Sequence, residues 1–456
     1  MARQTTNSGV LLLSHCGFSF LEDLIAVLEA RNVRSYVLSS LPLEQHRPDR
    51  LAGLEQKVDR LFSTERHELD FDDIDRVLDA LHAAGERVLA CISVWEGYRG
   101  LMAYANGLLG VSDLAPGKID GLRNKLALRQ RLYGAGLSAV RAQALTPAVL
   151  DRLRKEDGRR FIKPVSGIAS YGTFPLRADT TWATIERIRA EAAEDLMYRS
   201  ALTAGVDFLV EDYVNGREFS FELLVAGGSV HVVGLHEKCE VTETSGAVLE
   251  DSCTSPPYSI DSFACAAGIA WVRALFACLE LDWGCFHVEA RYDGIRWELI
   301  EINPRVGGSL ISHSVKALTG GDGVLELWVD LLLAHGPGCG TPCETYQRRL
   351  AALSYSDAGR QEGGLATFFR VYFARPGLVS AVALRDMTPA PAVAQVLLRP
   401  GDDIGNSVRE VFLGQLMWTM SRQARDASLP QLLRSSDQAI EIAYASDEPA
   451  MERTPS

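Results

Sequence analysis

The stretch from Cys285 to Ser309, CFHVEARYDGIRWELIEINPRVGGS, constrains the fold more than any other part of the chain. Its first half alternates apolar and polar residues, which is the period of a β-strand. Asp293-Gly294 is a tight-turn pair, and the strand pattern resumes over residues 297–302. The stretch therefore predicts a hairpin of two antiparallel strands.

Acidic and amide side chains converge on this hairpin. Glu289 lies on the first strand, and Glu301 and Asn303 lie two residues apart on the second, so alternation points both to one face. Mg²⁺ prefers such oxygen ligands and keeps positions for water and phosphate oxygens. Arg305 would add a positively charged guanidinium group with paired N–H donors, and Gly307-Gly308 would let backbone N–H groups approach a ligand. The pattern predicts a magnesium-nucleotide site; the alternative is a surface hairpin with solvated acids and Glu301 paired to Arg305.

Length and charge narrow the class of protein. The 456 residues, 47% of them hydrophobic, predict roughly three domains. A net charge of −13 argues against nucleic-acid binding, which needs basic patches. The apolar runs at 10–13 and 324–333 are too short or too charged to span a bilayer, so we expect no membrane partner and a cytoplasmic location. Nine cysteines scattered through apolar segments indicate reduced thiols.

The first 109 residues alternate strands with helices. Strands are predicted at 10–13, 33–38 and 88–94, and helices at 20–30, 70–83 and 101–109. This alternation predicts a doubly wound parallel sheet, whose ligands gather at the carboxyl ends of the strands. His15, Trp95 and Glu96 lie there, and Glu96 is a candidate substrate residue.

Two lysines and a Ser/Gly loop are suited to phosphate. Lys125 lies in the first turn of a helix predicted over 121–136, where a cation opposes the helix dipole. Lys163 ends a strand over 160–164, and the loop that follows contains Ser166, Gly167, Ser170 and Gly172. A point charge beside unencumbered N–H donors binds phosphate well. The spacing is not that of a Walker A motif.

These motifs together resemble the ATP-grasp superfamily of carboxylate–amine ligases, most of all the L-amino acid ligases (dipeptide synthetases). The resemblance rests on E-x-N-x-R-x-G-G after an apolar strand, on the helix opened by Asn124-Lys125, and on the lysine-ended strand with its loop. It implies ATP as cosubstrate and two Mg²⁺ ions, with Mn²⁺ as an alternative. The implied phosphate ligands are Lys125, Lys163, Ser166, Gly167, Ser170 and Gly172, and the implied metal ligands are Glu289, Glu301 and Asn303.

The resemblance also assigns the remaining ligand contacts. Glu211 and the backbone of Asp212 and Val214 would read adenine, and Glu218 would accept from the ribose hydroxyls. In the L-amino acid ligases a loop carries an acid and then a histidine that orient the amino substrate. Glu250 and Cys253 stand in the comparable stretch here, with a cysteine near the expected histidine, and a solvated loop is the alternative. Ser309 falls where the family lines its amino-acid pocket.

The fold implied is α/β: an ATP-grasp fold with an N-terminal doubly wound parallel-sheet domain and a small C-terminal α+β subdomain. The predicted domains are 1–118, 119–335 with a lid over about 140–213, 336–445, and a loose tail over 446–456. Residues 236–257 are predicted as a polar, flexible stretch. Short strands are predicted at 353–355, 368–374, 379–384, 394–398 and 411–414, followed by a helix at 431–443.

The predicted activity is an ADP-forming ligation of a carboxylate, with an amino acid as the expected acid, to an amine through an acyl phosphate, giving a dipeptide or an amide. Arg305 and the N–H groups near Gly307 and Gly308 would stabilise the oxyanion. Small-molecule acids and amines are the expected partners, and a homodimer is compatible with this hypothesis. The alternatives are a ligase that uses a thiol or another nucleophile, and a regulator that binds nucleotide without catalysis.

Overall fold

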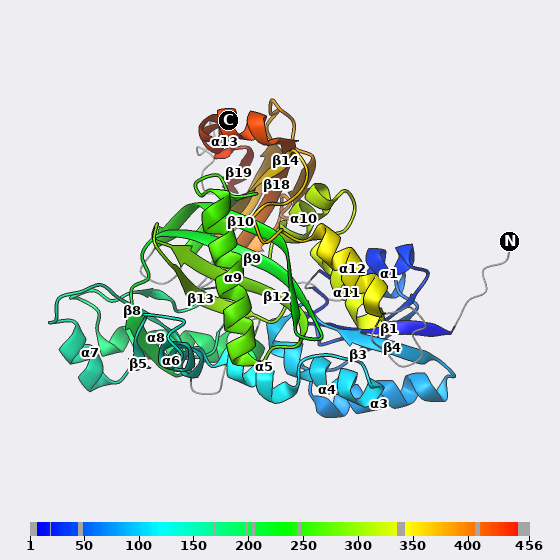
Figure 1. The fold of residues 1–456 in the computed structure, drawn as a ribbon. Helices are drawn as coiled ribbons and strands as arrows, with labels where there is room; N and C mark the ends of the chain where they lie inside the picture. The colour runs from blue at the N-terminus through cyan, green and yellow to red at the C-terminus, as the bar shows by residue number, and fades with distance from the viewer. Residues whose placement is uncertain are drawn as a thin grey trace, which may run out of the picture.

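The computed structural model describes residues 7–18, 20–43, 49–167, 170–196, 199–202, 206–243, 248–334, 343–405 and 411–445. Within them the chain forms four sheets: a parallel N-terminal sheet, a lid sheet, a central eight-stranded sheet and a small C-terminal sheet. In Figure 1 the blue N-terminal sheet and the teal lid lie at the two lower corners, and the C-terminal strands lie at the top. The predicted α/β class is confirmed.

The N-terminal sheet is parallel, as the alternation of strands and helices predicts. Its order is β3-β2-β1-β4, formed by Ser8–Ser14 (β1), Arg34–Ser39 (β2), Arg60–Ser63 (β3) and Arg87–Ile92 (β4). The connecting helices are Leu21–Ala30 (α1), Asp49–Glu55 (α2), Phe71–Ala83 (α3) and Arg99–Leu109 (α4). Asp70 caps α3 by accepting from the Asp73 N–H at 3.0 Å. The short β3 and α2 were not predicted.

An ion cluster fastens one end of this sheet. The carboxylate of Glu86, just before β4, accepts from Arg34 at 2.6 Å, the Tyr36 hydroxyl at 2.8 Å and Arg60 at 3.3 Å. Burial raises the pKa of Glu86, but the hydrogen bond from Tyr36 and the charge of Arg34 outweigh it and hold that pKa below its usual range. The cluster therefore joins β2, β3 and β4 through one ionised carboxylate.

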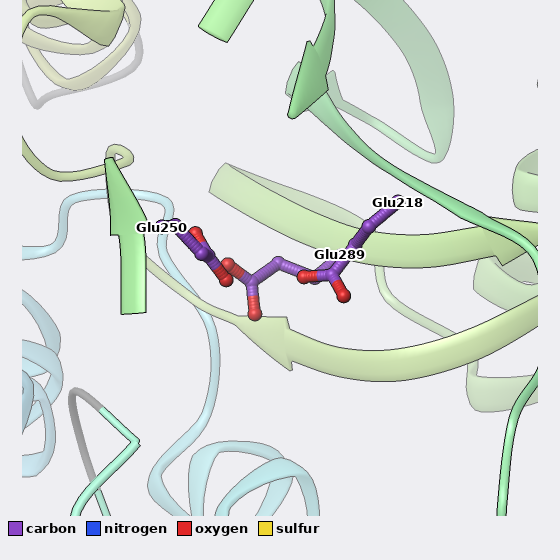
Figure 2. A group of neighbouring side chains, drawn as sticks. All are labelled: Glu218, Glu250 and Glu289. Atoms are coloured by element: carbon purple, nitrogen blue, oxygen red, sulfur yellow. The ribbon is translucent and has the colours of Figure 1, made fainter. Parts of the chain in front are cut away.

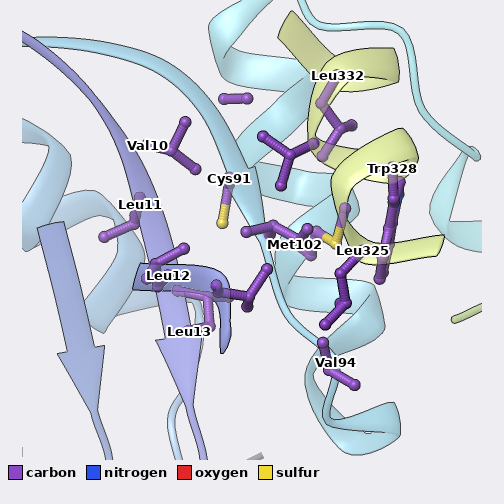
Figure 3. Packing of buried hydrophobic residues seen from close by; sticks show 14 of the residues in the cluster. Val10, Leu11, Leu12, Leu13, Cys91, Val94, Met102, Leu325, Trp328 and Leu332 are labelled. Atoms are coloured by element: carbon purple, nitrogen blue, oxygen red, sulfur yellow. The ribbon is translucent and has the colours of Figure 1, made fainter. Parts of the chain in front are cut away.

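The core of the N-terminal sheet is completed by a helix from much later in the chain. Figure 3 shows Val10, Leu12 and Cys91 of the sheet on one side and Trp328 and neighbouring leucines of Val324–Ala334 (α11) on the other. All these side chains are almost inaccessible to solvent. Burial of a large apolar side chain contributes about 1.5–3 kcal/mol, so this shared core holds the N-terminal sheet against the rest of the protein.

The entry helix is broken in two. Residues 116–123 form α5 (Pro116–Arg123) and residues 125–134 form α6 (Lys125–Gly134), where one helix over 121–136 was predicted. Asn124 ends α5, and its side chain accepts from the Ala127 N–H at 3.0 Å, which caps α6. The break places Lys125 at the first position of a new helix.

The lid is a four-stranded sheet in the order β5-β8-β6-β7. Its strands are Ala142–Ala144 (β5), Arg160–Pro164 (β6), Phe174–Pro175 (β7) and Phe208–Asp212 (β8), and its helices are Pro147–Leu153 (α7) and Trp182–Glu194 (α8). Strand β6 has the predicted bounds. A short 3-10 helix, Arg199–Ala201 (η3), contacts another in the N-terminal domain, Glu96–Tyr98 (η2), and the Trp95 indole N–H donates to the Ser200 hydroxyl at 2.8 Å.

The central sheet is antiparallel and runs β13-β12-β9-β10-β11-β14-β18-β16. Its first five strands are Arg217–Ala226 (β9), Ser229–Glu243 (β10), Val248–Ser255 (β11), Trp283–Tyr292 (β12) and Trp297–Asn303 (β13). The prediction of a flexible stretch over 236–257 is wrong in its described part, because 236–243 and 248–255 are paired strands. The predicted hairpin is present as β12 and β13.

Helix Ser262–Leu279 (α9) lies across the central sheet in Figure 1. By length and composition alone it could span a membrane. Its buried face, including Val272 and Phe276, packs into the core cluster of β9, β12 and β13, and core helices of soluble proteins pass the same test. It is therefore weak evidence for a membrane span.

The C-terminal strands extend the central sheet. Leu365–Ala374 (β14), Val411–Ser421 (β18) and Val393–Val396 (β16) continue it beyond β11, while Gly377–Leu384 (β15), Asp403–Ile404 (β17) and Ile440–Tyr444 (β19) form the small sheet. The flanking helices are Ile311–Thr319 (α10), Cys343–Leu353 (α12) and Arg422–Ser436 (α13). The predicted strand at 353–355 is wrong. Of the helix predicted at 431–443, residues 431–436 are helical as the end of α13, and residues 440–443 belong instead to β19. The predicted tail lies outside the described residues.

Candidate active site

A cavity between the lid and the central sheet collects most of the residues predicted to bind nucleotide. It is lined by Lys125, Lys163, Gly167, Ser170, Glu211, Val214, Glu218, Glu250, Glu289, Arg291 and Glu301, with Phe161, Tyr171 and Ile300 among the apolar residues. Its two walls come from β6 and β8 of the lid and from β9, β12 and β13 of the central sheet. The cavity combines an apolar slot with a polar end, as a nucleotide requires.

A buried ion network lies at the floor of this cavity. The Glu211 carboxylate accepts from Lys163 at 2.7 Å and from Arg129 at 3.0 Å. Burial raises the pKa of Glu211, but the two cations outweigh it and lower that pKa. Burial also lowers the pKa of Lys163, against the attraction of Glu211. Glu211 is thus engaged with cations of the protein, although it was predicted to contact adenine.

Lys125 joins the Ser/Gly loop to the hairpin. Its ammonium donates to the Gly167 carbonyl at 2.9 Å and lies 3.3 Å from the Glu301 carboxylate. Ser166 donates to the Arg123 carbonyl at 3.2 Å, which fixes the start of the loop. The structure therefore brings the loop and an acid of the hairpin to a single cation.

The end of the loop requires unusual backbone. Ser170 and Gly172 have φ of 56° and 65°, in the left-handed region. A Cβ on Gly172 would lie 3.0 Å from Ile188. Residues 168 and 169 of the predicted phosphate loop lie outside the described residues.

The crossover from the lid to the central sheet is held by arginines. The Asp212 carboxylate accepts from the Arg141 N–H at 3.0 Å, and the Asp212 N–H donates to the Arg141 carbonyl at 3.0 Å. The Val214 carbonyl accepts from Arg291 at 2.8 Å. A carbonyl oxygen has two lone pairs, so Val214 retains one for a ligand. The adenine contacts of Asp212 and Val214 stay predictions.

The hairpin places the predicted metal ligands as alternation requires. Glu289 on β12 is paired with Glu301 on β13, and the Asn303 amide donates to Glu301 at 2.8 Å. Both carboxylates line the nucleotide cavity. Two carboxylates and an amide oxygen on adjacent strands are a donor set that fits Mg²⁺.

A cluster of three glutamates surrounds a lysine next to these ligands. Figure 2 shows the side chains of Glu218, Glu250 and Glu289 pointing toward one another, and one oxygen of each lies within 4.8 Å of the others. The Lys238 ammonium lies 2.7 Å from Glu218 and 2.8 Å from Glu289, and it also pairs with Glu250. The structure therefore groups Glu218 and Glu250 with Glu289, a predicted metal ligand, where the resemblance assigned Glu218 to ribose and Glu250 to a substrate loop.

The charges in this cluster set the protonation of its members. Burial lowers the pKa of Lys238, but the three carboxylates outweigh it and raise that pKa well above its usual range. Burial raises the pKa of Glu289, but Lys238 and then His287 hold it well below its usual range. The pKa of Glu250 is raised well above its usual range by burial, because the attraction of Lys238 does not overcome it. Glu250 is thus the member of the cluster best able to hold a proton.

His287 fixes Glu289 from the other side. Its Nε2 lies 3.1 Å from Glu289, and its Nδ1 lies 2.7 Å from the fully buried Glu222. Burial lowers the pKa of His287, but Glu222 and Glu289 outweigh it and raise that pKa to about 10. A Cβ on Gly307 would lie 2.7 Å from His287 Nδ1, so this glycine allows the loop to approach the ring.

Arg305 is oriented by the N-terminal domain. Its Nε donates to the Glu96 carboxylate at 3.1 Å, and its Nη1 donates to the Val306 carbonyl at 3.0 Å. Glu96 is 4% exposed and belongs to η2. The alternative pairing of Arg305 with Glu301 is not the one formed, since Glu301 pairs with Lys125. Glu96 therefore holds the arginine rather than standing free in a pocket.

A second cavity of about 370 Å³ adjoins the nucleotide cavity and shares Ser170, Glu250, Glu289 and Glu301 with it. Arg305, Gly308, Ser309 and Cys253 line this second cavity. Ser309 has φ of 54° and donates to Gln415 on β18 at 2.8 Å. The two cavities meet at the predicted metal ligands, so two different ligands could react there.

Residues 160–313 match the family described as the ATP-grasp domain. The chain contains an ATP-grasp domain. This match confirms the recognised superfamily, and the predicted class of enzyme, an ATP-dependent ligase, agrees with it. A search of curated protein sequences found no match.

Solved structures resemble the whole chain, well beyond the ATP-grasp domain. The L-amino acid ligase from Bacillus licheniformis has a TM-score of 0.72 and 17% identity, covering 96% of this chain and 100% of that one. Phosphoribosylglycinamide synthetase from Anaerococcus prevotii has a TM-score of 0.63 and 12% identity, and the match covers 96% of this chain and 100% of that one. Biotin carboxylase from Campylobacter jejuni, in complex with β-γ-ATP, has a TM-score of 0.64 and 12% identity, and the match covers 95% of this chain and 92% of that one. At these identities the similarity establishes the fold.

The ATP-grasp domain does not contain every residue of the site. Lys125 precedes it, and Glu96 belongs to the N-terminal sheet domain. Sequence reasoning missed Lys238, Glu222 and His287. A signal for Glu222 and His287 was present in the strand period, since both alternate with apolar residues such as Phe221 and Val288 on strands that are almost fully buried. Their partners, however, are distant in the sequence.

Proposed function

We propose that the protein is an ATP-dependent, ADP-forming ligase that joins a carboxylate to an amine. The observation that carries this proposal is the meeting of the two cavities at Glu289 and Glu301, with Arg305 on the side away from the nucleotide. A γ-phosphate held in the first cavity would face an acid held in the second. The similarity to L-amino acid ligase supports an amino acid as the acid.

The nucleotide would be held by charges already grouped in the first cavity. Lys125, Lys163 and the loop from Ser166 to Gly172 would contact the phosphates. Glu289, Glu301 and Asn303 would hold two Mg²⁺ ions, which neutralise phosphate charge when bound. Phosphoryl transfer depends mainly on positioning and charge neutralisation, so a preformed cavity of this kind supplies most of what the reaction needs.

The chemistry proceeds in two steps. An oxygen of the acid attacks the γ-phosphorus, the bond to the β-phosphate oxygen breaks, and ADP leaves. The amine nitrogen then attacks the carbonyl carbon of the acyl phosphate, phosphate leaves, and the nitrogen loses a proton to water or phosphate. Arg305, held by Glu96, and the N–H groups near Gly307 and Gly308 would stabilise the oxyanion. Closure of the loop would exclude water, which otherwise hydrolyses the intermediate.

The test is ADP release from Mg-ATP with a panel of acids and amines, with mass spectra of the products. A product lighter by one water than its two substrates, formed with one ADP, would establish ligation. ATP binding without ADP release under any pair would contradict the proposal and favour a nucleotide-binding regulator.

The proposed role of Arg305 has its own test. Arg305→Ala should lower kcat by about 10²–10³ while the KM for ATP changes little, because the guanidinium acts on the second cavity. Arg296→Ala is the matched control, since Arg296 lies at the exposed turn of the same hairpin. A normal kcat in Arg305→Ala would refute the role.

A further inference from the structure

The second cavity has two ends of opposite character. Toward the nucleotide it is lined by Lys238, Glu250, Glu289, Asn303 and Arg305, all charged or polar. At the other end it is lined by apolar side chains of β14 and β18 and by Ile311 of α10. Phe20, Val94 and Trp95 of the N-terminal domain complete the apolar lining, and Trp95 extends it toward the charged end because it precedes Glu96, the partner of Arg305. A ligand that spans the cavity must therefore be charged at one end and apolar at the other.

Strand period creates the apolar end. Phe369, Val371 and Phe373 alternate along β14 and face this cavity, while Phe368 and Tyr372 pack into the core on the opposite side of the sheet. Phe373 is paired with Phe412 on β18, with their rings 5.2 Å apart at 63°. The two rings form an edge-to-face wall that a third ring can extend.

The order of strands sets the distance between the two ends. β14 pairs with β11, which carries Glu250, and lies two strands from β10, which carries Lys238, so about 5–10 Å of sheet separates these charged side chains from the first apolar strand. Among the described residues that line the cavity, the cations are Lys238, His287 and Arg305, all at the charged end. The apolar end therefore offers no counter-charge to a second carboxylate and accepts an uncharged group.

We propose that the acid activated by this enzyme carries a large apolar side chain, preferentially an aromatic ring. This side chain binds between β14, β18 and the wall formed by Phe20, Val94 and Trp95. This inference rests on the proposed ligase function and names its substrate class. The carboxylate lies at Arg305, and the ring contacts Phe373 and Phe412. The specificity residues thus lie on strands beyond the ATP-grasp match, which ends at residue 313.

Matched acids test this inference. Six acids would be supplied one at a time with Mg-ATP and hydroxylamine, whose nitrogen captures an acyl phosphate as a hydroxamate. They form three pairs, each of an amino acid and a similar acid that lacks an amino group: phenylalanine and 3-phenylpropionate, alanine and propionate, glutamate and succinate. The amine substrate then need not be known. We expect kcat/KM for the phenyl acids to exceed that for the methyl acids by about tenfold or more. A preference for alanine, propionate or the diacids would overturn the inference while leaving ligation intact.

Variants locate the preference in the structure. Phe373→Ala should lower kcat/KM for the phenyl acids by about 10–200-fold with the KM for ATP unchanged. Val371→Phe should fill the cavity and shift preference toward the methyl acids, which covers the case in which Phe373→Ala fails to fold. Phe263→Ala, at a position on α9 that is 80% exposed, is the control and should change neither constant. Unaltered selectivity in folded Phe373→Ala and Val371→Phe would overturn the assignment.

A binding measurement separates failure of the two proposals. Calorimetry would titrate 3-phenylpropionate and propionate into the protein with ADP and Mg²⁺. Selective binding of the phenyl acid without hydroxamate from any acid would support the substrate class and overturn ligation. Equal binding of both acids, or binding of neither, would overturn the substrate class.

Discussion

Replacement of Lys238 by methionine removes the cation from the centre of the glutamate cluster. The Lys238 side chain is 3% exposed, and its three partners would be left facing one another. Removing one partner of a buried ion pair typically costs about 3–5 kcal/mol. Because Glu250 can take up a proton, part of the repulsion is relieved, and we expect a loss of about 3 kcal/mol in the free energy of unfolding.

Mg²⁺ should restore much of this loss. In the natural protein the ammonium already occupies the space among the carboxylates, so a metal ion adds little there. In Lys238→Met the three oxygens are open to a divalent cation, which at a hundred times its Kd stabilises the folded state by about 2.7 kcal/mol. Urea unfolding with and without Mg²⁺ measures both effects, and Mg²⁺ should raise the midpoint of the variant more than that of the natural protein.

The control is Lys118→Met, which removes an exposed pair with Glu280. An exposed pair contributes about 0–1 kcal/mol, so this variant should unfold close to the natural protein and respond to Mg²⁺ as it does. If Lys238→Met loses no more stability than Lys118→Met, or if Mg²⁺ shifts all three proteins equally, the reasoning about the cluster is wrong.

Three further predictions follow from other contacts. Glu86 has a lowered pKa, so its ionised form stabilises the fold above about pH 4.5, and this stabilisation is lost as the pH falls through the folded pKa. The urea midpoint of Glu86→Gln should therefore be lower than that of the natural protein near neutral pH, and the two midpoints should converge in acid. Arg129→Met leaves Glu211 with one cation, so it should lower the free energy of unfolding by about 3–5 kcal/mol and raise the KM for ATP. Equal melting temperatures for the variant and the natural protein would contradict this. Trp95→Phe removes the donor to Ser200 and should raise the KM for ATP a few-fold at unchanged thermal stability.

The parts of the site that depend on local period were predictable from the sequence. Alternation alone placed Glu301 and Asn303 on one face, and the structure shows their side chains hydrogen-bonded. The strand that carries Lys163 has the expected bounds, Arg160–Pro164, for the same reason. The parallel N-terminal sheet also followed from the order of its elements, because parallel strands need helical crossovers.

The errors occurred where partners are distant in the sequence. Residues 236–243 are polar enough to predict a loop, yet His236, Glu237 and Lys238 are all buried. They are buried because other elements supply partners, such as Ser314 on helix α10 for His236 and Glu218 on strand β9 for Lys238. A single sequence does not show such pairings, so polarity was interpreted as exposure. The C-terminal helix was displaced for a related reason, because the apolar pattern at 440–444 belongs to an added strand.

The continuity of the central sheet bears on how nucleotide and acid are matched. Strands β9, β12 and β13 carry Glu218 and the predicted metal ligands, and β14 and β18 carry the apolar wall of the second cavity. Strands β10 and β11 lie between these groups and carry Lys238 and Glu250. Side chains on paired strands are fixed relative to one another by the ladder of hydrogen bonds. A change of residue on β14 can therefore alter which acid is bound without moving the predicted metal ligands, which allows substrate choice to vary while the ATP chemistry is kept.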